Sequence, residues 1–359
     1  MLRAEDFREV VSGRRGGLSG PLLRGVLRVA ELPYSMAVGF RNRRYDLLRA
    51  KIERVAVPVI CVGNLTLGGT GKTPLVKWLA SWMTSRGAQP AIISRGYRSA
   101  DGKPNDEALE LRQALPDVPH VQNADRVAAA RAAIDDHCCS VILLDDGFQH
   151  RRLARDLNIV LLDALEPFGY EHVFPRGTLR EPLNGLQRAD IVCLSRADAV
   201  SPDERQAIRH RVSEIAPQVA WCEVSHAPSG LINTSGDSQS MPTLQGRRVA
   251  AFCGIGNPAG FRHTLAVAGG EIVDWREFPD HHAYTEADLH ELAEATQRAR
   301  AEIAVCTQKD LVKIARQNLA GHPLWAVAIE IEFLAGQDAM EAALEKVRMT
   351  SEGRMTNDE

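Results

Sequence analysis

The sequence predicts an α/β protein made of a three-layer α/β/α lobe and a second, smaller α/β lobe. Short runs rich in Val and Ile alternate with amphipathic segments along most of the chain. These runs are apolar at every position, which is typical of strands buried on both faces of a mainly parallel sheet covered by helices. A length of 359 residues is also too great for one minimal domain and suggests about two.

The expected elements follow from these runs. In the first lobe we expect strands at 57–62, 90–94, 140–145, 158–163, 190–195 and 219–224, and helices at 73–85, 124–136 and 202–216. In the second lobe we expect strands at 248–253, 270–275, 302–306 and 324–332, and helices from about 258 and at 285–301. The stretch 227–244 is rich in Ser, Gly and Pro, which indicates a linker or an interdomain crossover. The predicted organisation is an N-terminal segment 1–54, a first lobe 55–226, a linker 227–244, a second lobe 245–335, and a C-terminal helix and tail 336–359.

Charge and cysteine content exclude several classes of protein. With 43 basic and 46 acidic residues the net charge is −3, so nothing indicates a nucleic-acid partner. The seven cysteines show no C-x-x-C spacing, so neither a disulfide framework nor a zinc site is expected, which fits a cytoplasmic location. No apolar run is long enough to span a bilayer, and the N-terminus lacks the apolar core of a secretory signal. We therefore expect a soluble or peripheral protein.

The strongest functional signal is a glycine-rich loop between a buried strand and a helix. Residues 66–73 match the P-loop pattern G-x-x-x-x-G-K-[ST], except that Thr66 stands at the first glycine. Small residues let backbone N–H groups surround a phosphate, and the helix N-terminus adds partial positive charge. Lys72 is expected to reach the β- and γ-phosphates, and the Thr73 hydroxyl to bind Mg²⁺. The expected nucleotide-binding residues of this P-loop NTPase-like lobe are Thr66, Gly68, Gly69, Thr70, Gly71, Lys72 and Thr73.

A pair of acidic residues is the expected partner of the P-loop. The apolar run SVILL is followed by Asp145 and Asp146. Ligands of α/β folds bind at the carboxyl ends of parallel strands, so either carboxylate is placed to bind the metal. A strand-end cap or a solvated pair is the alternative interpretation.

Two further strings resemble nucleotide-binding motifs more weakly. GIGNPA at 254–259 fits the G-x-G-x-x-G/A dinucleotide pattern, with Asp274 twenty residues beyond Gly254. However, Pro258 forces the preceding residue into an extended conformation, which disfavours a nicotinamide or flavin site. SRAD at 195–198 resembles the guanine-reading N-K-x-D of GTPases with two positions changed, and an ordinary strand–turn is the better interpretation.

Seven motifs, in order along the chain, resemble a single family. They are GNLTLGGTGKTP (63–74), ISRGY (93–97), NDEALEL (105–111), LLDDGFQHRRL (143–153), FPRGTLREPL (174–183), FPDHHAYT (278–285) and TQKDLVK (307–313). As a set they are similar to the tetraacyldisaccharide 4′-kinase, or lipid A 4′-kinase, family. The similarity is densest over 57–182, and the linker and the residues after about 335 carry no diagnostic motif.

The resemblance implies a membrane-peripheral kinase of lipid A biosynthesis, on the cytoplasmic face of the inner membrane. Such a kinase uses ATP and Mg²⁺ to phosphorylate the 4′-hydroxyl of a tetraacyl-disaccharide 1-phosphate. The family's phosphate and metal positions fall on Lys72 and Thr73, and its acidic pair falls on Asp145 and Asp146. Its further site positions, which we assign to substrate binding, fall on His150, Arg180 and Glu181.

A base for the acceptor hydroxyl is also needed, because a sugar hydroxyl is a poor nucleophile at neutral pH. The sequence alone offers Asp106, Asp145, Asp146 and Asp280. The resemblance implies that Asp106 is the base and that His281 pairs with it, as a base held by a second group. A surface turn beside Pro279 is the alternative for the histidine. If the two residues come from different lobes, the site is completed only when the lobes close.

The motifs depart from the family pattern at three places. NDEA replaces GDEP, TQKD replaces TEKD, and PRGTLREP replaces PAGPLREP. Because Asp106 and Asp310 are retained, we expect activity to be retained, with changes confined to the neighbours of the sugar or the metal.

The N-terminal segment is the candidate for membrane contact. Residues 1–54 hold twelve basic and six acidic residues and so carry a net charge of +6, whereas residues 55–359 carry −9. Within 21–44, Leu23, Val26, Leu27 and Ala30 recur at helical spacing, with arginines beside them. Such a segment can lie in the bilayer interface with its arginines on anionic headgroups. It can equally pack on the core with its arginines extended to solvent.

Two other classes of function remain open at this point. A P-loop switch or metallochaperone-type NTPase is weakly favoured by SRAD, but it has no need of the motifs at 174–183 and 278–285. A dinucleotide-dependent oxidoreductase depends on GIGNPA alone.

Overall fold

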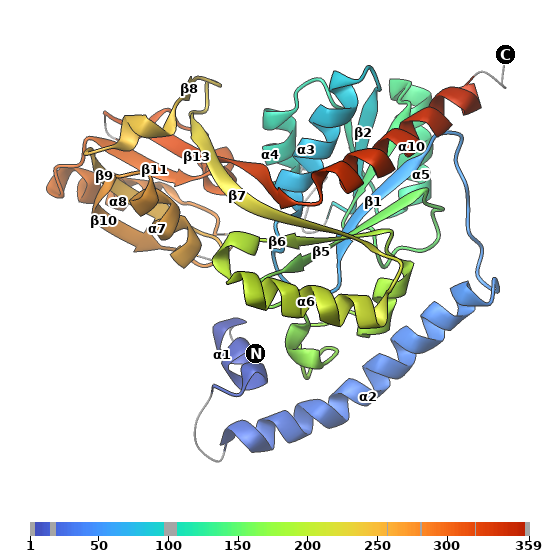
Figure 1. The fold of residues 1–359 in the computed structure, drawn as a ribbon. Helices are drawn as coiled ribbons and strands as arrows, with labels where there is room; N and C mark the ends of the chain where they lie inside the picture. Colours follow the sequence, from blue (N-terminus) through green and yellow to red (C-terminus); the bar gives the residue numbers. More distant parts are fainter. Residues whose placement is uncertain are drawn as a thin grey trace. The chain divides into compact units, whose positions relative to one another are not determined.

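The computed structural model describes residues 4–14, 19–96, 106–256, 258–280, 282–319 and 321–355 (Figure 1). The chain divides into two compact units, here called unit 1 and unit 2. Unit 1 comprises 1–95, 118–225 and 332–359, and unit 2 comprises 96–117 and 226–331. Two segments thus group differently from the predicted lobes: 96–117 belongs with unit 2, and the chain from 332 onward belongs with unit 1.

Unit 1 is built on a parallel sheet with the strand order β7-β6-β5-β1-β4-β2-β3. The strands are β1 (Val59–Asn64), β2 (Pro90–Ser94), β3 (His120–Gln122), β4 (Val141–Asp145), β5 (Leu157–Asp163), β6 (Ile191–Ser195) and β7 (Ala220–Ile232). β1 lies between β4 and β5, in the registers Val59↔Ile142 and Ile60↔Leu157. β1, β2, β4 and β6 are buried at every residue, as their uniformly apolar sequences predict.

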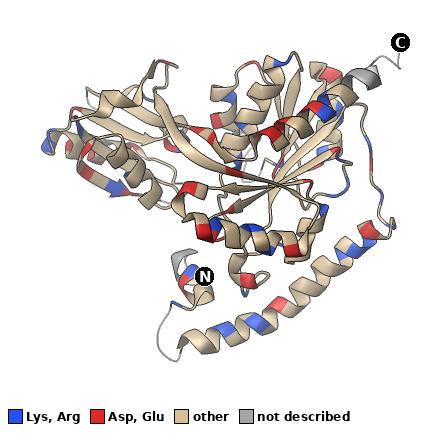
Figure 2. Cartoon of the chain, viewed as in Figure 1, with Lys and Arg blue, Asp and Glu red and all other residues tan. Residues whose placement is uncertain are grey.

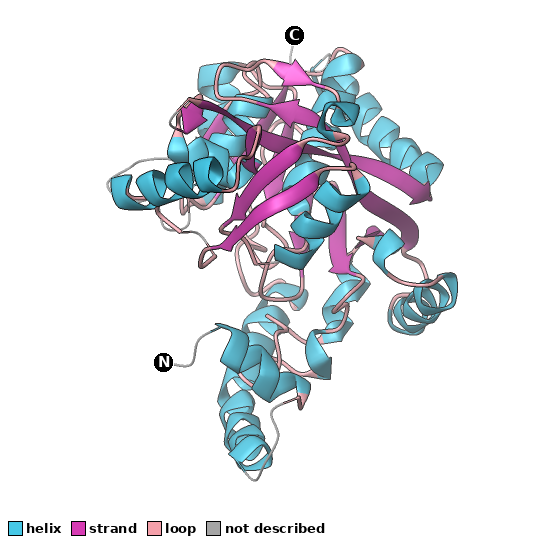
Figure 3. Ribbon diagram, turned by 90° about the vertical axis from the view of Figure 1, so that its left-hand side faces the viewer, coloured by secondary structure: helices cyan, strands magenta, loops and turns pink. Residues whose placement is uncertain are grey.

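Helices cover both faces of this sheet and give the three predicted layers (Figures 1 and 3). On one face, α5 (Arg126–His137) and α6 (Pro202–Ile215) pack against alternate strand residues such as Cys61 and Ile142. On the other, α3 (Lys72–Ser85) contacts β1, β2 and β4, and α10 (Gln337–Met355) contacts β5. The core of unit 1 is therefore assembled from residues near both ends of the chain.

In unit 2, four strands are paired in parallel in the order β10-β9-β11-β13. They are β9 (Arg248–Cys253), β10 (Glu271–Glu277), β11 (Ile303–Thr307) and β13 (His322–Ala335). The short β12 (Asn318–Leu319) pairs antiparallel with β13, and the short β8 (Ser238–Gln239) pairs antiparallel with β7. α7 (Pro258–Val267) packs in one core, and α8 (Glu286–Arg298) and α9 (Gln308–Ile314) pack in another. α4 (Asp106–Ala114) packs against α9.

The segment predicted as a linker is in part a strand. β7 continues to Ile232, and it pairs with β13. Ser225 and Ser229 donate hydrogen bonds from their hydroxyls to the carbonyls of Glu332 and Ala328, each at 3.5 Å. Strand pairing depends mainly on backbone groups, so this stretch forms a strand although its Ser and Pro residues hide any apolar pattern. Both β7 and β13 run from one unit into the other.

The N-terminal segment forms α1 (Ala4–Ser12) and the long α2 (Ser19–Asp46). The polar face of α2 is bonded to the rest of unit 1. Glu31 Oε1 accepts from the backbone N–H of Val173 at 2.9 Å, and the Tyr34 hydroxyl donates to the carbonyl of Arg180 at 3.3 Å. The opposite face of α2, here called the outer stripe, is exposed and apolar. It consists of Leu22, Val26, Val29, Leu32, Met36 and Phe40, which are 59–74% exposed.

The predicted apolar stripe therefore coincides with the exposed one only in part. Val26 and Ala30 are exposed, whereas Leu23 and Leu27 are half-buried, and the arginines beside them contact other parts of unit 1. Arg24 donates to the carbonyl of Val10 at 3.5 Å, and Arg28 lies 3.3 Å from the ring of His172. Among the described helices, α2 included, none is long and apolar enough to cross a bilayer.

Candidate active site

The P-loop joins β1 to α3 at the carboxyl edge of the unit 1 sheet. Gly68 and Gly71 have φ angles of 114° and 79°, in the left-handed region that glycine adopts without a steric penalty. The first part of the loop is extended instead: Thr66 forms a bridge with Leu179, and the Leu67 N–H donates to the Thr178 carbonyl at 2.7 Å. A threonine in place of the first glycine is therefore compatible with the loop, because this position is paired like a strand.

Two carbonyls of the P-loop are held by side chains at the ends of β5 and β6. The Ser195 hydroxyl is fully buried and donates to the Thr70 carbonyl at 2.7 Å. Arg196 donates to the Gly69 carbonyl at 3.0 Å and forms an ion pair with Asp163. We call Asp163, Ser195 and Arg196 the P-loop clamp. An ordinary strand–turn was the expected structure of SRAD, so this role was not predicted; a Ser-Arg pair at the end of a buried strand was its one sequence signal.

A cluster of charged side chains lies beside the loop. Lys72 Nζ is 3.4 Å from Asp146 Oδ1, and Arg180 Nη1 donates to both oxygens of Asp146 at 2.9 Å. Burial acts to raise the pKa of Asp146, but the positive charges of Lys72 and Arg180 outweigh it and lower the pKa to about 2. Asp146 is thus ionised at neutral pH and holds two cations at the P-loop. Asp145, at the end of β4, is buried.

The residues at this edge fit a nucleotide phosphate. Thr73 is buried in the first turn of α3, and the buried hydroxyl of Thr70 has no hydrogen-bond partner within the described part of the chain. A buried hydroxyl without a partner in a phosphate-binding loop is a group that a ligand can satisfy.

A metal ion at this edge would need phosphate oxygens of a nucleotide as ligands, in addition to side chains of the protein. The described residues contain no group of three or more His, Cys, Asp and Glu side chains that could hold a metal ion. Mg²⁺ in nucleotide sites is typically bound by one or two carboxylates together with phosphate oxygens. Thr73, Asp145 and Asp146 fit that arrangement only when a nucleotide is present.

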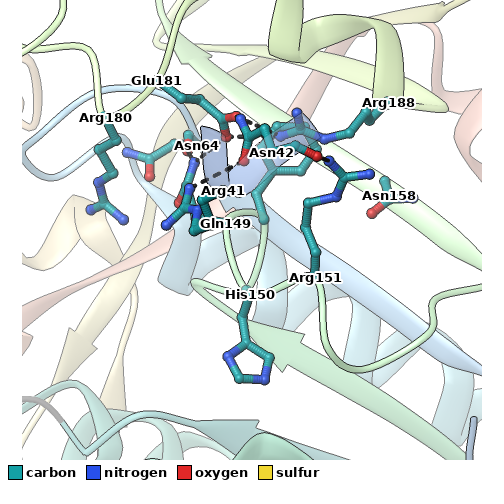
Figure 4. A network of polar contacts seen from close by, with 12 residues as sticks. Arg41, Asn42, Asn64, Gln149, His150, Arg151, Asn158, Arg180, Glu181 and Arg188 are labelled. Atoms are coloured by element: carbon teal, nitrogen blue, oxygen red, sulfur yellow. Dashed lines mark hydrogen bonds and ion pairs between the residues drawn. The ribbon is translucent and has the colours of Figure 1, made fainter. Parts of the chain in front are cut away.

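Glu181 connects α2 to the site through a buried network (Figure 4). Its side chain is 1% exposed, and its carboxylate accepts hydrogen bonds from Asn42 at 2.8 Å, Gln149 at 3.0 Å and Arg188 at 2.8 Å. Gln149 also donates to the carbonyl of Asn64 at the end of β1, at 2.9 Å. A buried carboxylate is tolerated when it is paired and hydrogen-bonded in this way. The sequence analysis did not identify Asn42, Gln149 or Arg188, because only the fold shows that they share a partner.

The three residues assigned to substrate binding have different partners. Arg180 bonds to Asp146, Glu181 bonds to its internal network, and the His150 ring points away from Glu181 (Figure 4). Burial, reinforced by the charges of Arg126 and Arg155, lowers the pKa of His150 to about 4. The ring is therefore neutral at pH 7, and its buried Nε2 has no hydrogen-bond partner in the described ranges.

In unit 2, three sequence motifs meet at the carboxyl edge of the sheet. Asp310, in the first turn of α9, is fully buried. Its Oδ2 accepts from the Gly254 N–H at 3.0 Å and from the Thr307 hydroxyl at 2.6 Å. A Cβ on Gly254 would lie 3.2 Å from both Asp310 Oδ1 and the carbonyl of Pro279, so the glycine permits this close approach. Asp310 of the TQKD motif therefore fixes the loop that follows β9, next to the loop that carries Asp280.

The expected catalytic pair falls largely outside the described residues. His281 lies outside them, and Asp106 begins α4 without a described side chain. The helix that starts at Asp106 groups with unit 2, which also contains the chain on both sides of position 281. This differs from the expectation that the two residues come from different lobes.

The family of the chain follows from its similarity to known proteins. The profile of the family described as tetraacyldisaccharide-1-P 4′-kinase matches residues 23–348. The chain belongs to this family. A tetraacyldisaccharide 4′-kinase from Anaeromyxobacter sp. (strain K) is 39% identical over 350 residues, covering 92% of each chain. One from Halothermothrix orenii is 34% identical over 322 residues, covering 82% of this chain and 84% of the relative.

A solved member of the tetraacyldisaccharide-1-P 4′-kinase family shares the fold. It is LpxK from Aquifex aeolicus, crystallised in complex with ATP. It matches this structure with a TM-score of 0.73 and 29% identity, covering 90% of this chain and 99% of the other. These findings confirm the family, the fold class and the assignment as a kinase, and they disfavour both the switch NTPase and the oxidoreductase.

Proposed function

We propose that this protein transfers the γ-phosphate of ATP to the 4′-hydroxyl of a tetraacyl-disaccharide 1-phosphate in lipid A biosynthesis. The observation that carries the proposal is the P-loop edge of unit 1, where Lys72 and Arg180 flank Asp146 in a chain of the tetraacyldisaccharide-1-P 4′-kinase family. Relatives bear the name of this activity, and LpxK from Aquifex aeolicus was solved with ATP.

Phosphoryl transfer requires positioning and positive charge more than covalent help from the protein. The P-loop N–H groups and Lys72 bind the β- and γ-phosphates, and the P-loop clamp keeps the loop carbonyls turned toward Ser195 and Arg196. Lys72 and Arg180 exchange their contacts with Asp146 for contacts with phosphate oxygens when the nucleotide binds. Thr73 and the acidic pair would hold Mg²⁺, which would neutralise charge on the phosphates.

Asp106 is the proposed base and His281 the residue that orients it, on the strength of the NDEA and FPDHH motifs. In this assignment Asp106 accepts the proton of the 4′-hydroxyl as its oxygen bonds to the γ-phosphorus and ADP leaves. Asp106→Ala is expected to lower kcat by about 10²–10⁴-fold while ATP binding, measured by calorimetry, is unchanged. A parallel loss of ATP affinity would make Asp106 a metal ligand instead.

The decisive experiment is transfer of label from [γ-³²P]ATP to a disaccharide 1-phosphate acceptor, with separation of lipid-bound label. Lys72→Ala is expected to lower transfer by roughly 10²–10³-fold, because it removes a cation from the developing charge. Lys77→Ala, on the same helix but outside the P-loop motif, is the matched control and should retain activity. Strict GTP selectivity without a labelled acceptor would contradict the proposal and favour the switch NTPase.

The outer stripe of α2 supports a peripheral location on the cytoplasmic face of the inner membrane. An exposed apolar helix face of this kind binds the interface between headgroups and acyl chains, where an acylated substrate lies. Val29→Glu/Met36→Glu is expected to reduce flotation with phospholipid vesicles several-fold without a change in thermal stability. A control matched in charge is Gln206→Glu/Ser213→Glu at exposed positions of α6. Equal flotation of both variants would contradict membrane binding through α2.

A further inference from the structure

A basic cavity of about 370 Å³ lies at the C-terminal end of α2, within unit 1. Five cations line it and no acidic side chain does; the cations are Arg41, Arg44, Arg49, Lys51 and Arg152. The rings of Phe40 and Tyr45 complete its lining. In Figure 2 the last turns of α2 carry basic residues next to an acidic one. A concave surface that carries one sign of charge concentrates ions of the opposite sign.

Part of this charge is balanced and part is not. Arg152 bonds to Glu53 at 2.8 Å and to Asp125 at 3.0 Å, and Lys51 lies 3.7 Å from Glu53. By contrast, the guanidinium groups of Arg44 and Arg49 form no hydrogen bond or ion pair with any residue that the structure describes. The cavity therefore presents two arginines whose donors are available to a ligand.

The carbonyl groups at the C-terminal end of α2 repel an anion in this cavity less than such groups usually do. The last carbonyls of a helix normally carry partial negative charge and lack internal donors. In α2 three of the last four carbonyls have a donor: Arg43 O accepts from Leu47 N (3.0 Å), Arg44 O from Arg49 N (2.8 Å) and Tyr45 O from Leu48 N (3.0 Å). The carbonyl before them, that of Asn42, accepts from Arg151 Nη1 (3.1 Å).

We propose that this cavity is a second phosphate site, which binds a phosphate group at the membrane surface through Arg44 and Arg49. Guanidinium groups bind phosphate oxygens through paired, charge-assisted hydrogen bonds. The surface location follows from Phe40, which lines the cavity and is also the last residue of the outer stripe. The acyl chains of a ligand can then lie along the stripe while its phosphate enters the cavity.

Two kinds of lipid carry a phosphate group that could bind in this cavity. One is the acceptor itself, whose 1-phosphate is remote from the 4′-hydroxyl; this source rests on the proposed function. Tyr34, on α2, contacts Arg180 at the P-loop edge. Arg44 lies ten residues further along the same helix, a distance of about 15 Å. The other source is the phosphate of an anionic phospholipid headgroup. Both place a phosphate beside acyl chains.

The test uses the full chain with Arg44→Gln/Arg49→Gln (R44Q/R49Q). The control R43Q/R209Q removes the same charge from exposed residues outside the cavity, on α2 and α6. Kinetics are measured with a disaccharide acceptor that carries the 1-phosphate and with one that lacks it, in neutral detergent. Flotation is measured with phosphatidylcholine vesicles, with and without phosphatidic acid. Thermal unfolding is expected to be unchanged, because both arginines are exposed.

If the cavity takes the 1-phosphate, R44Q/R49Q raises KM about tenfold for the phosphorylated acceptor only, and kcat is retained. If it takes a headgroup, the variant loses the added flotation with phosphatidic acid and raises neither KM. Either result supports the site and identifies its source. If R44Q/R49Q behaves as R43Q/R209Q in both measurements, the cavity binds no phosphate. Failure of the proposed function would appear separately, as wild-type protein that labels no acceptor while the flotation arm still reports on the cavity.

Discussion

The carboxyl ends of the strands in the two units carry charged residues with opposite roles. At the edge in unit 1, Lys72, Asp146 and Arg180 bond to one another through side chains alone, and such contacts can be exchanged for contacts with a ligand. At the edge in unit 2, Asp310 is fully buried and bonds to the Gly254 backbone and the Thr307 hydroxyl, so its charge holds a loop in shape. Substitutions in unit 1 should therefore affect nucleotide kinetics, and those at Asp310 should affect stability.

The largest effect that tests this contrast is expected at Asp310. Asp310→Ala leaves the buried Gly254 N–H without its acceptor and should lower the free energy of unfolding by about 1–3 kcal/mol. Asp310→Asn keeps an oxygen acceptor and should cost less. Urea unfolding of both variants measures the difference. A stable Asp310→Ala protein with weakened ATP binding would place Asp310 in the nucleotide site and remove the contrast.

A smaller effect is expected in the P-loop clamp. Ser195→Ala removes the hydrogen bond to the Thr70 carbonyl and should raise KM for ATP several-fold, with KM for the lipid acceptor unchanged. Ser225→Ala, which removes a buried hydroxyl bonded to β13 rather than to the P-loop, is the matched control. Steady-state kinetics with each substrate varied in turn separate the two. Equal changes in both KM values would mean that Ser195 serves only general stability.

The smallest effect concerns His150, a neutral group near the charged edge of unit 1. Its folded-state pKa of about 4 lies below the ordinary value of 6.5. Between these values the unfolded chain binds a proton that the folded chain does not, so stability falls as pH is lowered from 6.5 to 4. His150→Gln should flatten this decline in urea unfolding at pH 7 and pH 5, whereas His210→Gln, on an exposed histidine, should not. An unchanged slope would mean that His150 is not buried as a neutral ring.

The sequence predicted most strands and helices within one or two residues where burial on both faces left a uniform apolar run. The boundaries of β2 and β9 coincide with the predicted ones, and α3 begins one residue earlier than expected. The strand predicted at 219–224 is shorter than β7, because the pairing of the second half of β7 with β13 depends on backbone groups. The apolar stripe of α2 was predicted correctly only at Val26 and Ala30, since the face of the helix that is covered depends on partners such as Val173 and Arg180.

The candidate site could be predicted from the sequence where its residues are close together in the chain. The P-loop and the acidic pair are each contiguous, and their residue types alone indicate phosphate and metal. The role of Ser195 was missed because its acceptor lies 125 positions away at Thr70. The assignment of Glu181 to substrate binding stays a prediction, but its partners could not be predicted from the sequence, because they come from α2, from the loop after β4 and from the turn that carries Arg188.

The position of α10 has a consequence for the order of folding during synthesis. Met340, Leu344 and Val347 are buried in unit 1, whose P-loop leaves the ribosome long before them. Domains usually fold as they emerge, N-terminal ones first. Here the unit that emerges first waits for α10, and most of unit 2 is made in the interval. A premature stop codon just before position 340 would therefore harm the nucleotide-binding unit more than the unit made just before α10.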